Sequence, residues 1–297
     1  MPVPSLNWLA LSRYIFLGLL CGLILLPACE NKESENPFAG IPSPGNNPVT
    51  AEGVAFGKSL FQSELLSSDG KTSCFTCHRP DSGFSGSINH LNPHSKIRRQ
   101  IPSLFNLAWS PSFFWDAREE TLESLIMKPI QSPDEMNLSL PLLLKKVNQK
   151  QELKQMCRAA FQTDSIGTVH VARALAQFIR TIVQQPELPD SEGKTLFQKH
   201  CAKCHSGKTT SDFQIRKSVL APSGIDSGYF RITHLPEDVY SFRTPGLAAV
   251  SKTAPYMHDG RVSDLDLLVK MYANELPAKE LEDPDKRSEL VRFLKTL

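Results

Sequence analysis

The sequence predicts a mainly α-helical protein that is built from two related units. Apolar residues recur at three- and four-residue spacing from Val169 to Val183, which is typical of one face of a helix, and no stretch alternates convincingly as a β-strand would. The pentapeptide Gly-Lys-Ser-Leu-Phe at 57–61 returns as Gly-Lys-Thr-Leu-Phe at 193–197. An internal repeat of this kind indicates two related domains.

The other helices are predicted from local signals. Thr50 opens a helical stretch that runs through Phe61. Shorter helices are predicted at Thr121–Met127, Leu140–Asn148, Asp264–Ala273 and Ser288–Lys295. Two long loops, 82–106 and 206–253, contain Phe, Leu and Ile, so we expect them to be ordered around cofactors.

Each copy of the repeat precedes a Cys-x-x-Cys-His motif, at 74–78 and at 201–205. This pattern is the attachment signature of a c-type haem, because two thiols can form thioethers with the porphyrin and the adjacent histidine can ligate the iron. We predict two covalently bound haem c groups. Their cofactor-binding residues are Cys74, Cys77 and His78 in the first unit, and Cys201, Cys204 and His205 in the second.

Two other roles for the paired cysteines fit less well. A four-cysteine zinc site usually has about 15–20 residues between its pairs, whereas Cys77 and Cys201 are 124 residues apart. A thioredoxin-like redox pair would need a βαβ context, which the sequence does not show. The remaining cysteine of the predicted globular body, Cys157, is expected to be a buried apolar residue and to form no disulfide.

The N-terminus predicts export. An apolar run from Tyr14 to Leu26 follows Arg13, and its thirteen residues are too few to span a bilayer but suit a signal peptide. The next residues resemble a bacterial lipoprotein signal, with Cys29 as the site of a membrane lipid anchor. Ordinary cleavage nearby, or an uncleaved anchor that extends back to Trp8, are the alternatives. We expect a membrane-tethered protein in the periplasm of a Gram-negative bacterium.

These signals divide the chain into four predicted segments. They are a signal peptide at 1–28, a flexible tether at 29–49, a first haem domain at 50–185 and a second at 186–297. The tether is rich in Asn, Ser, Pro and Gly, and two prolines between Gln184 and Asp190 mark the boundary between the domains. A net charge of only +2 gives no reason to expect a nucleic-acid partner.

Segments outside the two haem motifs resemble the bacterial diheme cytochrome c peroxidases and their relative MauG. The matching segments are 113–118 (Phe-Phe-Trp-Asp-Ala-Arg), 128–130 (Lys-Pro-Ile), 133–136 (Pro-Asp-Glu-Met), 244–247 (Thr-Pro-Gly-Leu) and 253–261 (Thr-Ala-Pro-Tyr-Met-His-Asp-Gly-Arg). The resemblance runs from about Thr50 to the C-terminus. It implies two cytochrome-c-like haem domains with long loops, the first with the peroxide-reactive haem and the second with the electron-transfer haem.

The resemblance also implies roles for single residues. Glu135 aligns with the glutamate over the first haem, where a base must take a proton from bound H2O2 and return it to the leaving oxygen. Trp115 aligns with the tryptophan between the two haems, and Pro129 with a proline that lines the peroxide pocket. Without the family context, Glu135 would be interpreted as a helix N-terminal or surface acid, and Trp115 as a core aromatic.

The sixth ligand of the second haem separates two branches of this family. The alignment places Tyr272 at that position, where ordinary diheme peroxidases have methionine and MauG has tyrosine. Met271 is the alternative, and neighbours on a helix point about 100° apart, so only one of them can face the iron. A tyrosinate ligand favours higher oxidation states of iron than a thioether does. The implied metal ligands are therefore His78, His205 and Tyr272.

Three departures from the family pattern bear on these sites. Leu125 stands where a glutamine is expected in the peroxide pocket. Asn92 stands near the switchable histidine, with His90 and His94 close by, and without such a histidine the first haem keeps an open coordination position. Gln100 stands where many members supply an asparagine ligand to calcium, so a Ca2+ ion between the domains is a further candidate cofactor.

The resemblance implies an exported diheme peroxidase that reduces H2O2 at the first haem and uses the second as an electron relay. Its electrons would come from a small cytochrome c or cupredoxin, or, as in MauG, from side chains of a partner protein. Tyr272 and Leu125 favour the second version. The alternative from another class is a non-enzymatic diheme electron-transfer cytochrome, which would have two six-coordinate haems and no reaction with peroxide.

Overall fold

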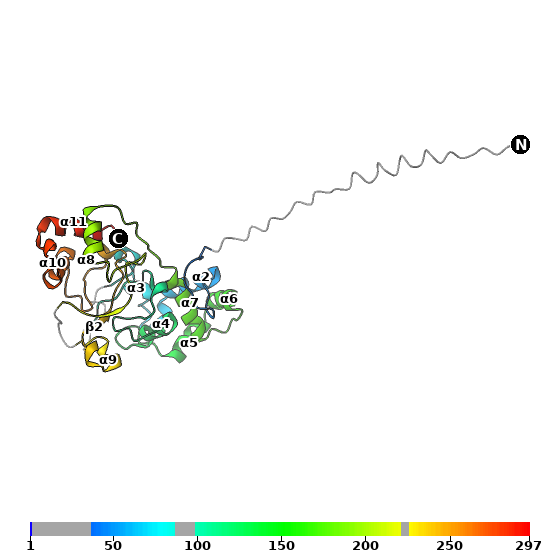
Figure 1. Ribbon diagram of the computed structural model, residues 1–297. Coiled ribbons are helices and arrows are strands. Elements are labelled where there is room, and N and C mark those ends of the chain that lie inside the picture. The colour runs from blue at the N-terminus through cyan, green and yellow to red at the C-terminus, as the bar shows by residue number, and fades with distance from the viewer. Residues whose placement is uncertain (2–36, 87–98, 221–225) are drawn as a thin grey trace. The chain divides into compact units, whose positions relative to one another are not determined.

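The computed structural model describes residues 1, 37–86, 99–220 and 226–297, and its regular structure is almost entirely helical (Figure 1). Its α-helices are α2 (Ala51–Gln62), α3 (Cys74–Cys77), α4 (Leu122–Gln131), α5 (Leu140–Asn148), α6 (Gln151–Phe161), α7 (Thr168–Arg180), α8 (Glu192–His200), α9 (Phe230–Thr233), α10 (Leu265–Glu275) and α11 (Pro284–Leu294). Strands β1 (Ile215–Lys217) and β2 (Ser241–Arg243) pair antiparallel, with Ile215 opposite Arg243. The predicted mainly α fold class is confirmed.

The helices predicted from the sequence are present, most of them with shifted ends. Helix α5 has the predicted bounds, and α2 begins directly after Thr50, whose side chain accepts a hydrogen bond from the Gly53 amide. Helix α7 ends at Arg180 rather than Val183, and α11 begins at Pro284. Helices α6 and α9 and the two strands were not predicted. Strands of three residues are too short to show an alternating pattern.

In the first half of the body, residues 40–185, the central contact is between α2 and α7. A side-chain carbon on Gly57 of α2 would lie 1.9 Å from the carbonyl oxygen of Ala174 on α7, so only glycine allows the two backbones to approach this closely. One turn along, the rings of Phe61 and Phe178 lie 5.1 Å apart. The glycine and phenylalanine of the repeat therefore form one helix-packing unit.

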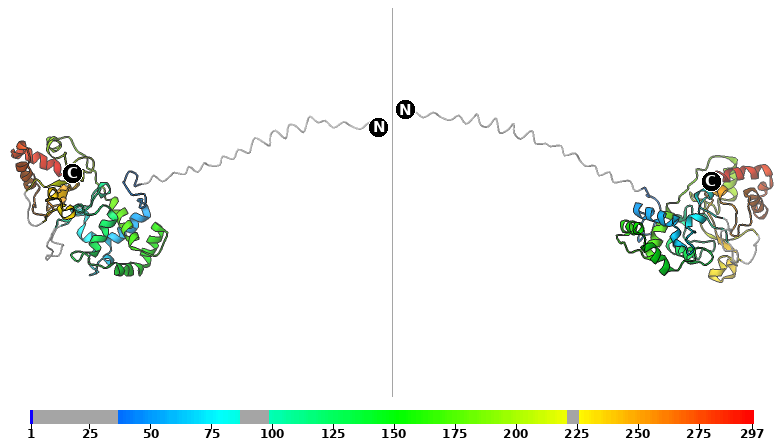
Figure 2. Two further views of the ribbon diagram at one scale, coloured as in Figure 1. Left: turned by 60° about the horizontal axis from the view of Figure 1, so that its bottom comes forward. Right: turned by 180° about the vertical axis from the view of Figure 1, so that it is seen from behind.

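The second half, residues 186–297, repeats this unit with α8 and α11. A side-chain carbon on Gly193 would lie 2.3 Å from the carbonyl oxygen of Glu289, and the rings of Phe197 and Phe293 lie 5.3 Å apart. Helix α11, red in Figure 2, packs against α8 on one side and against α10, orange, on another. The sequence repeat thus corresponds to a repeat in three dimensions.

Buried apolar side chains form two clusters that follow these halves. The first cluster draws on residues from Phe56 to Ile182, and the second on residues from Leu196 to Leu297. The segment 184–190, in which the domain boundary is predicted, lies between them in sequence and contains no helix or strand. Contacts also run between the halves, and Gly40–Leu297 forms one compact unit.

The ordered body begins before the predicted start of the first domain. Asn47 and Val49 are buried, and the Asn47 side chain bonds Glu123 and Gln177. The end of the predicted tether is therefore fixed to the body by a buried amide. The predicted signal peptide and Cys29 lie outside the described residues. No helix in the described part of the chain is both long enough and apolar enough to cross a membrane.

Candidate functional site

The two cysteines of the first motif lie at the two ends of the one-turn helix α3, and His78, the last residue of the motif, follows this helix directly. The Nδ1 atom of His78 lies 2.8 Å from the Phe84 carbonyl oxygen, which can only accept a hydrogen bond, so Nδ1 donates. Burial lowers the pKa of His78 and keeps its ring neutral. A neutral imidazole with Nδ1 bonded to the backbone presents Nε2 as a metal ligand.

The second motif orients its histidine in the same way. The Nδ1 atom of His205 lies 3.3 Å from the Thr210 carbonyl oxygen, and burial lowers the pKa of His205. The ring is again neutral, and Nε2 is the nitrogen left to ligate a metal. Both histidines therefore fit the role of proximal ligand to a haem iron.

Within the described part of the chain, the four motif cysteines and Cys157 form no disulfide, and Cys157 is fully buried as predicted. Burial is the main cause that raises the pKa of both Cys74 and Cys201 to about 12. Among the described residues, no three His, Cys, Asp or Glu side chains gather as a metal site, so the two cysteine pairs do not meet in a four-cysteine zinc site. Separate pairs, each followed by an oriented histidine, fit two covalently attached haems.

Glu135 lies in a turn between α4 and α5, and no helix begins at this residue. Its amide donates to the Ser132 carbonyl oxygen at 3.0 Å. The next amide, of Met136, donates to the carbonyl oxygen of Pro129 at 3.1 Å, and the Met136 side chain is buried. Pro129 and Met136 therefore hold the turn that presents Glu135, and the interpretation of Glu135 as a helix N-terminal acid is excluded.

The carboxyl of Glu135 is electrostatically linked to the first haem motif. After burial, its negative charge is the next cause that raises the pKa of Cys77, and it adds to the raised pKa of Cys74. Desolvation raises the pKa of Glu135 itself, against the opposing charge of Arg118. Glu135 as a whole residue is nevertheless exposed, so the desolvation of its carboxyl is only partial.

Trp115 lies where segments of the two halves meet. Its indole nitrogen donates to the Gln100 carbonyl oxygen at 2.7 Å, and its own carbonyl oxygen accepts from the Arg243 amide of β2 at 2.9 Å. The side chain is only half-buried, whereas the neighbouring Phe113 belongs to the first apolar cluster. Trp115 is therefore held at the junction of the halves and is not simply a core aromatic.

Tyr272 and Met271 follow each other on α10 and have different surroundings. Burial raises the pKa of Tyr272, and the charges of Cys201 and Cys204 raise it further, so the phenol lies within electrostatic reach of the second haem motif. Met271 packs against the second apolar cluster. These surroundings favour Tyr272 over Met271 as a group directed toward the second haem.

An ion-pair network joins the two halves next to Trp115. Arg99 contacts Asp116 at 2.7 Å and Asp226 of the second half at 2.7 Å, and Asp116 also accepts from Arg118 at 2.8 Å. Sequence reasoning did not identify this network. Asp116 and Arg118 belong to the family segment at 113–118, but the two distant partners, Arg99 and Asp226, carry no local signal.

Two of the residues that depart from the family pattern, Leu125 and Gln100, lie in the described part of the chain. Asn92, His90 and His94 lie outside the described residues. Leu125 packs against the first apolar cluster. Gln100 is buried, and its side-chain oxygen and nitrogen have no hydrogen-bond partner in the described structure.

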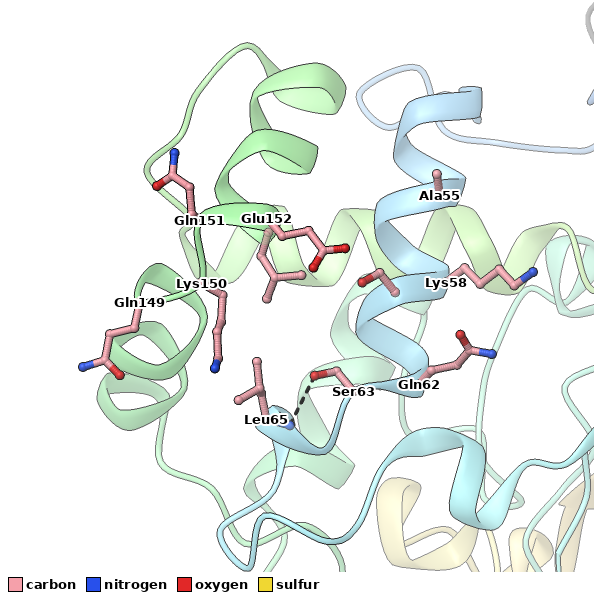
Figure 3. Close-up of a pocket in the computed structure, with 11 residues that line it drawn as sticks. Ala55, Lys58, Gln62, Ser63, Leu65, Gln149, Lys150, Gln151 and Glu152 are labelled. Atoms are coloured by element: carbon pink, nitrogen blue, oxygen red, sulfur yellow. Dashed lines mark hydrogen bonds between the residues drawn. The ribbon is translucent and has the colours of Figure 1, made fainter.

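A surface pocket of about 690 Å3 lies elsewhere, between α2 and the start of α6 (Figure 3). Lys58 and Gln62 line it from α2, and Lys150 and Glu152 from the other side. It contains none of the predicted functional residues. The candidate site is therefore the pair of haem motifs with Glu135, Trp115 and Tyr272, and not this pocket.

Comparisons with known proteins match nearly the whole body of the chain. The family model described as di-haem cytochrome c peroxidase matches residues 51–192. The methylamine utilization protein MauG of Methylorubrum extorquens is 33% identical over 287 residues, which cover 86% of this chain and 81% of that protein. The cytochrome c551 peroxidase of Pseudomonas aeruginosa is 29% identical over 279 residues, which cover 84% and 80%.

Solved structures show the same fold. The crystal structure of a MauG-like protein associated with microbial copper homeostasis has a TM-score of 0.76 at 23% identity, and the match covers 86% of this chain and 92% of that one. The diheme peroxidase BthA of Burkholderia thailandensis has a TM-score of 0.70 at 19% identity, with 84% and 87% covered.

Proposed function

Since the chain belongs to the diheme cytochrome c peroxidase and MauG family, we propose that it reduces H2O2 at the haem of His78 and uses the haem of His205 as an electron relay. Membership of this family makes the chain a diheme peroxidase, an oxidoreductase with two c-type haems. It also favours the enzyme over the non-enzymatic electron carrier. The residue roles, the electron source and export are parts of the proposal.

The observation that carries the proposal is the position of Glu135 beside the first haem motif. Its charge contributes to the raised pKa of Cys74 and of Cys77, which attach the haem. Desolvation raises the pKa of Glu135, and this brings the carboxyl toward the range in which it can both accept and return a proton near neutral pH. A perturbed acid beside a cofactor-attachment motif is a strong candidate for a catalytic group.

Cys74, Cys77 and His78 would hold a haem whose iron, with an open coordination position, would bind peroxide and supply the electrons for cleavage of the O–O bond. In this proposal, Glu135 accepts a proton from the bound H2O2 and returns it to the departing oxygen, which leaves as water. Pro129 and Met136 hold the turn that carries Glu135, so the carboxyl is already in place when the bond breaks.

Trp115 is proposed as the intermediate step for electrons between the two haems. The hydrogen bond from its indole to the Gln100 carbonyl oxygen and the one that its own carbonyl accepts from Arg243 fix it from both sides. A rigid aromatic ring at the junction provides a π-system between the cofactors. The structure supports this role through the position and the fixation of the ring.

Tyr272 is proposed as the sixth ligand of the second haem. Ligation requires that the phenol lose its proton, and burial raises that pKa, so this role depends on the positive charge of a bound metal. An anionic oxygen ligand lowers the reduction potential of the haem relative to a methionine sulfur. Such a haem shares oxidising equivalents more readily than it stores electrons, which favours oxidation of a partner protein.

Two electron sources remain within the proposal, and one titration separates them. One stoichiometric equivalent of H2O2 is added to the fully ferric protein, and the haem absorption is followed. A long-lived oxidised form without prior reduction supports the MauG-like version, which oxidises side chains of a partner protein. Reaction only after one-electron reduction supports a peroxidase that is supplied by a small cytochrome c or a cupredoxin.

The role of Glu135 is tested by Glu135→Gln. We expect the rate of reaction with H2O2 to fall by about 100- to 10,000-fold, which is the usual contribution of a positioned acid–base group, while both haems remain attached. Stopped-flow absorption measures this rate. Glu64→Gln serves as the control, because Glu64 is exposed and lies outside the site. An undiminished rate in Glu135→Gln removes Glu135 from the mechanism.

Calcium is a further part of the proposal, supported by Gln100. Its buried side-chain oxygen has no partner among the described residues, and Ca2+ prefers oxygen ligands. Since no acidic cluster surrounds it in the described structure, the remaining ligands would be backbone carbonyls or water. Metal analysis after purification in calcium-containing buffer should find one bound equivalent in the native protein and less in Gln100→Ala.

Export with a lipid anchor on Cys29 completes the proposal. The apolar run at 14–26 and the following Pro-Ala-Cys support it. In a Gram-negative host, the native protein should fractionate with membranes and Cys29→Ser should not. Equal distribution of the two proteins would contradict the anchor.

A further inference from the structure

Arg243, at the end of β2, is a deeply buried arginine whose charge the described protein does not neutralise. It is only 6% exposed, and it forms no ion pair with a carboxylate of the described chain. The comparably buried Arg180, at 5% exposure, contacts Glu123 at 2.9 Å. Arg99 contacts both Asp116 and Asp226. Arg243 therefore differs from the other well-buried arginines.

Within the described structure, the contacts of the Arg243 side chain are all with neutral groups. Its Nε donates to the Phe114 carbonyl oxygen at 3.1 Å, and one terminal nitrogen donates to Ser110 Oγ at 3.4 Å. The ring of Phe213 lies 5.7 Å from the guanidinium carbon. These contacts use two of the five N–H donors of the guanidinium and leave its charge uncompensated.

A buried charge without a counter-ion is strongly unfavourable, so a guanidinium in this position requires an anion. Desolvation lowers the pKa of Arg243 to about 10, and no negative group among the described residues opposes this. Each haem carries two propionates, which are carboxylates that can bond a guanidinium through two parallel hydrogen bonds. The cofactors thus supply the class of anion that the described chain lacks here.

The position of Arg243 relates it to the second haem. The next residue, Thr244, accepts a hydrogen bond from Ser211 at its carbonyl oxygen, and the neighbouring Thr210 carbonyl oxygen orients His205. Phe213, whose ring lies against the guanidinium, follows Thr210 and Ser211 in the same loop. Arg243 therefore belongs to the segment that packs on residues 210–213, the loop that orients His205.

From these contacts we propose that Arg243 is the counter-charge and hydrogen-bond donor for a propionate of the haem that His205 holds. The proposal rests on the presence of two haems and not on the peroxide chemistry of Glu135. A purely structural role, in which Arg243 only pins Phe114 and Ser110, is the competing explanation. The two explanations differ in whether the electrochemistry of the second haem responds to the charge.

The test is a spectroelectrochemical titration of both haems in Arg243→Met, with Arg180→Met as the matched control. A positive charge beside a haem favours its reduced state, so Arg243→Met should lower the midpoint potential of the second haem and leave that of the first unchanged. Arg180→Met removes an equally buried arginine and should move neither potential. Unchanged potentials in a fully loaded Arg243→Met protein, or a change in the first haem alone, would overturn the proposal.

Arg243→Lys keeps the test decisive if the methionine variant does not load haem. Lysine retains the charge but not the planar donor pair, so the second-haem potential should stay near that of the native protein. The propionate bending bands in resonance Raman spectra should shift, because the hydrogen bonding to the carboxylate changes. A second-haem potential well below that of the native protein, or unshifted propionate bands, would contradict the assignment. Glu135→Gln should leave both readouts unchanged, so the two proposals fail independently.

Discussion

In the first half, Gly57 of α2 faces the backbone of α7, and in the second half Gly193 of α8 faces the backbone of α11. Each glycine precedes a phenylalanine that contacts a phenylalanine of the facing helix, and each helix leads toward a Cys-x-x-Cys-His motif with its histidine oriented by a backbone carbonyl. The scaffold and the attachment chemistry are therefore repeated.

The groups that approach each motif from elsewhere are not repeated. Glu135, on a turn held by Pro129, is within electrostatic reach of the first motif, whereas Tyr272, on α10, is within electrostatic reach of the second. An acid–base group suits a haem that reacts with peroxide, and a phenol suits a haem whose sixth position is closed. The two halves thus share a packing unit, and we attribute the different functions of the two haems to one side chain that comes from another segment in each half.

Replacement of Tyr272 should have the largest effect on this contrast. According to our proposal, Tyr272→Phe removes the sixth ligand of the second haem, which should become high-spin, so that both haems resemble the first. In Tyr272→Met the second haem should stay low-spin with a higher midpoint potential, because thioether replaces an anionic oxygen. Magnetic circular dichroism of the ferric protein detects both changes.

Met271→Leu is the control for Tyr272, since Met271 packs in the second apolar cluster. It should leave the spectrum of the second haem unaltered. A lost or altered low-spin signal in Met271→Leu, together with a native spectrum in Tyr272→Phe, would reverse the assignment.

The similarity of the two halves predicts similar destabilisation by Gly57→Ala and Gly193→Ala. Each added methyl would meet a backbone carbonyl oxygen, at 1.9 and 2.3 Å, which cannot move away as a flexible side chain can. We expect each substitution to lower the free energy of unfolding by about 3 kcal/mol. Chemical denaturation followed by circular dichroism measures this.

Gly45→Ala is the matched control, because a side-chain carbon at Gly45 meets no atom within 4 Å. Its effect should stay within about 0.5 kcal/mol. If Gly57→Ala is destabilising and Gly193→Ala is not, the two helix pairs are not equivalent. This result would contradict our interpretation of the two pairs as a structural repeat.

A smaller effect is expected in the pH dependence of peroxide reduction. Glu135 must be ionised to accept a proton, and partial desolvation raises its pKa above the ordinary value of 4.5. The reaction rate should therefore fall as the pH decreases through a pKa higher than that of an exposed glutamate. Stopped-flow rates between about pH 4 and pH 8 measure this limb. Glu135→Gln should abolish it, and a limb that persists in this variant would point to another group.

The repeat and the motifs could be predicted because they are local in sequence. Cys74 and His78 are separated by one helical turn, and the pattern of Gly57 and Phe61 follows from one helix face. The position of Glu135 beside the first motif could be expected only from the family resemblance. Its own neighbours, Pro129 and Met136, became clear from the backbone hydrogen bonds of the turn.

The junction between the halves could not be predicted from the sequence. Arg99 bonds Asp226, which is 127 residues away, and Arg243 donates to the carbonyl oxygen of Phe114, which is 129 residues away. Tertiary contacts decide whether an arginine is buried and whether a carboxylate lies close to it. Such contacts produce no periodic pattern in the sequence. Helix α6 was missed for a related reason, because only Leu153 and Cys157 of this polar helix are buried.

The central claim is that a protein side chain closes the sixth coordination position of the second haem, whereas that of the first haem stays open. Electron paramagnetic resonance of the fully ferric native protein tests it most directly. The account predicts one high-spin signal from the haem of His78 and one low-spin signal with an oxygen donor from the haem of His205. Two low-spin signals, each with the character of His/Met or His/His ligation, would contradict it.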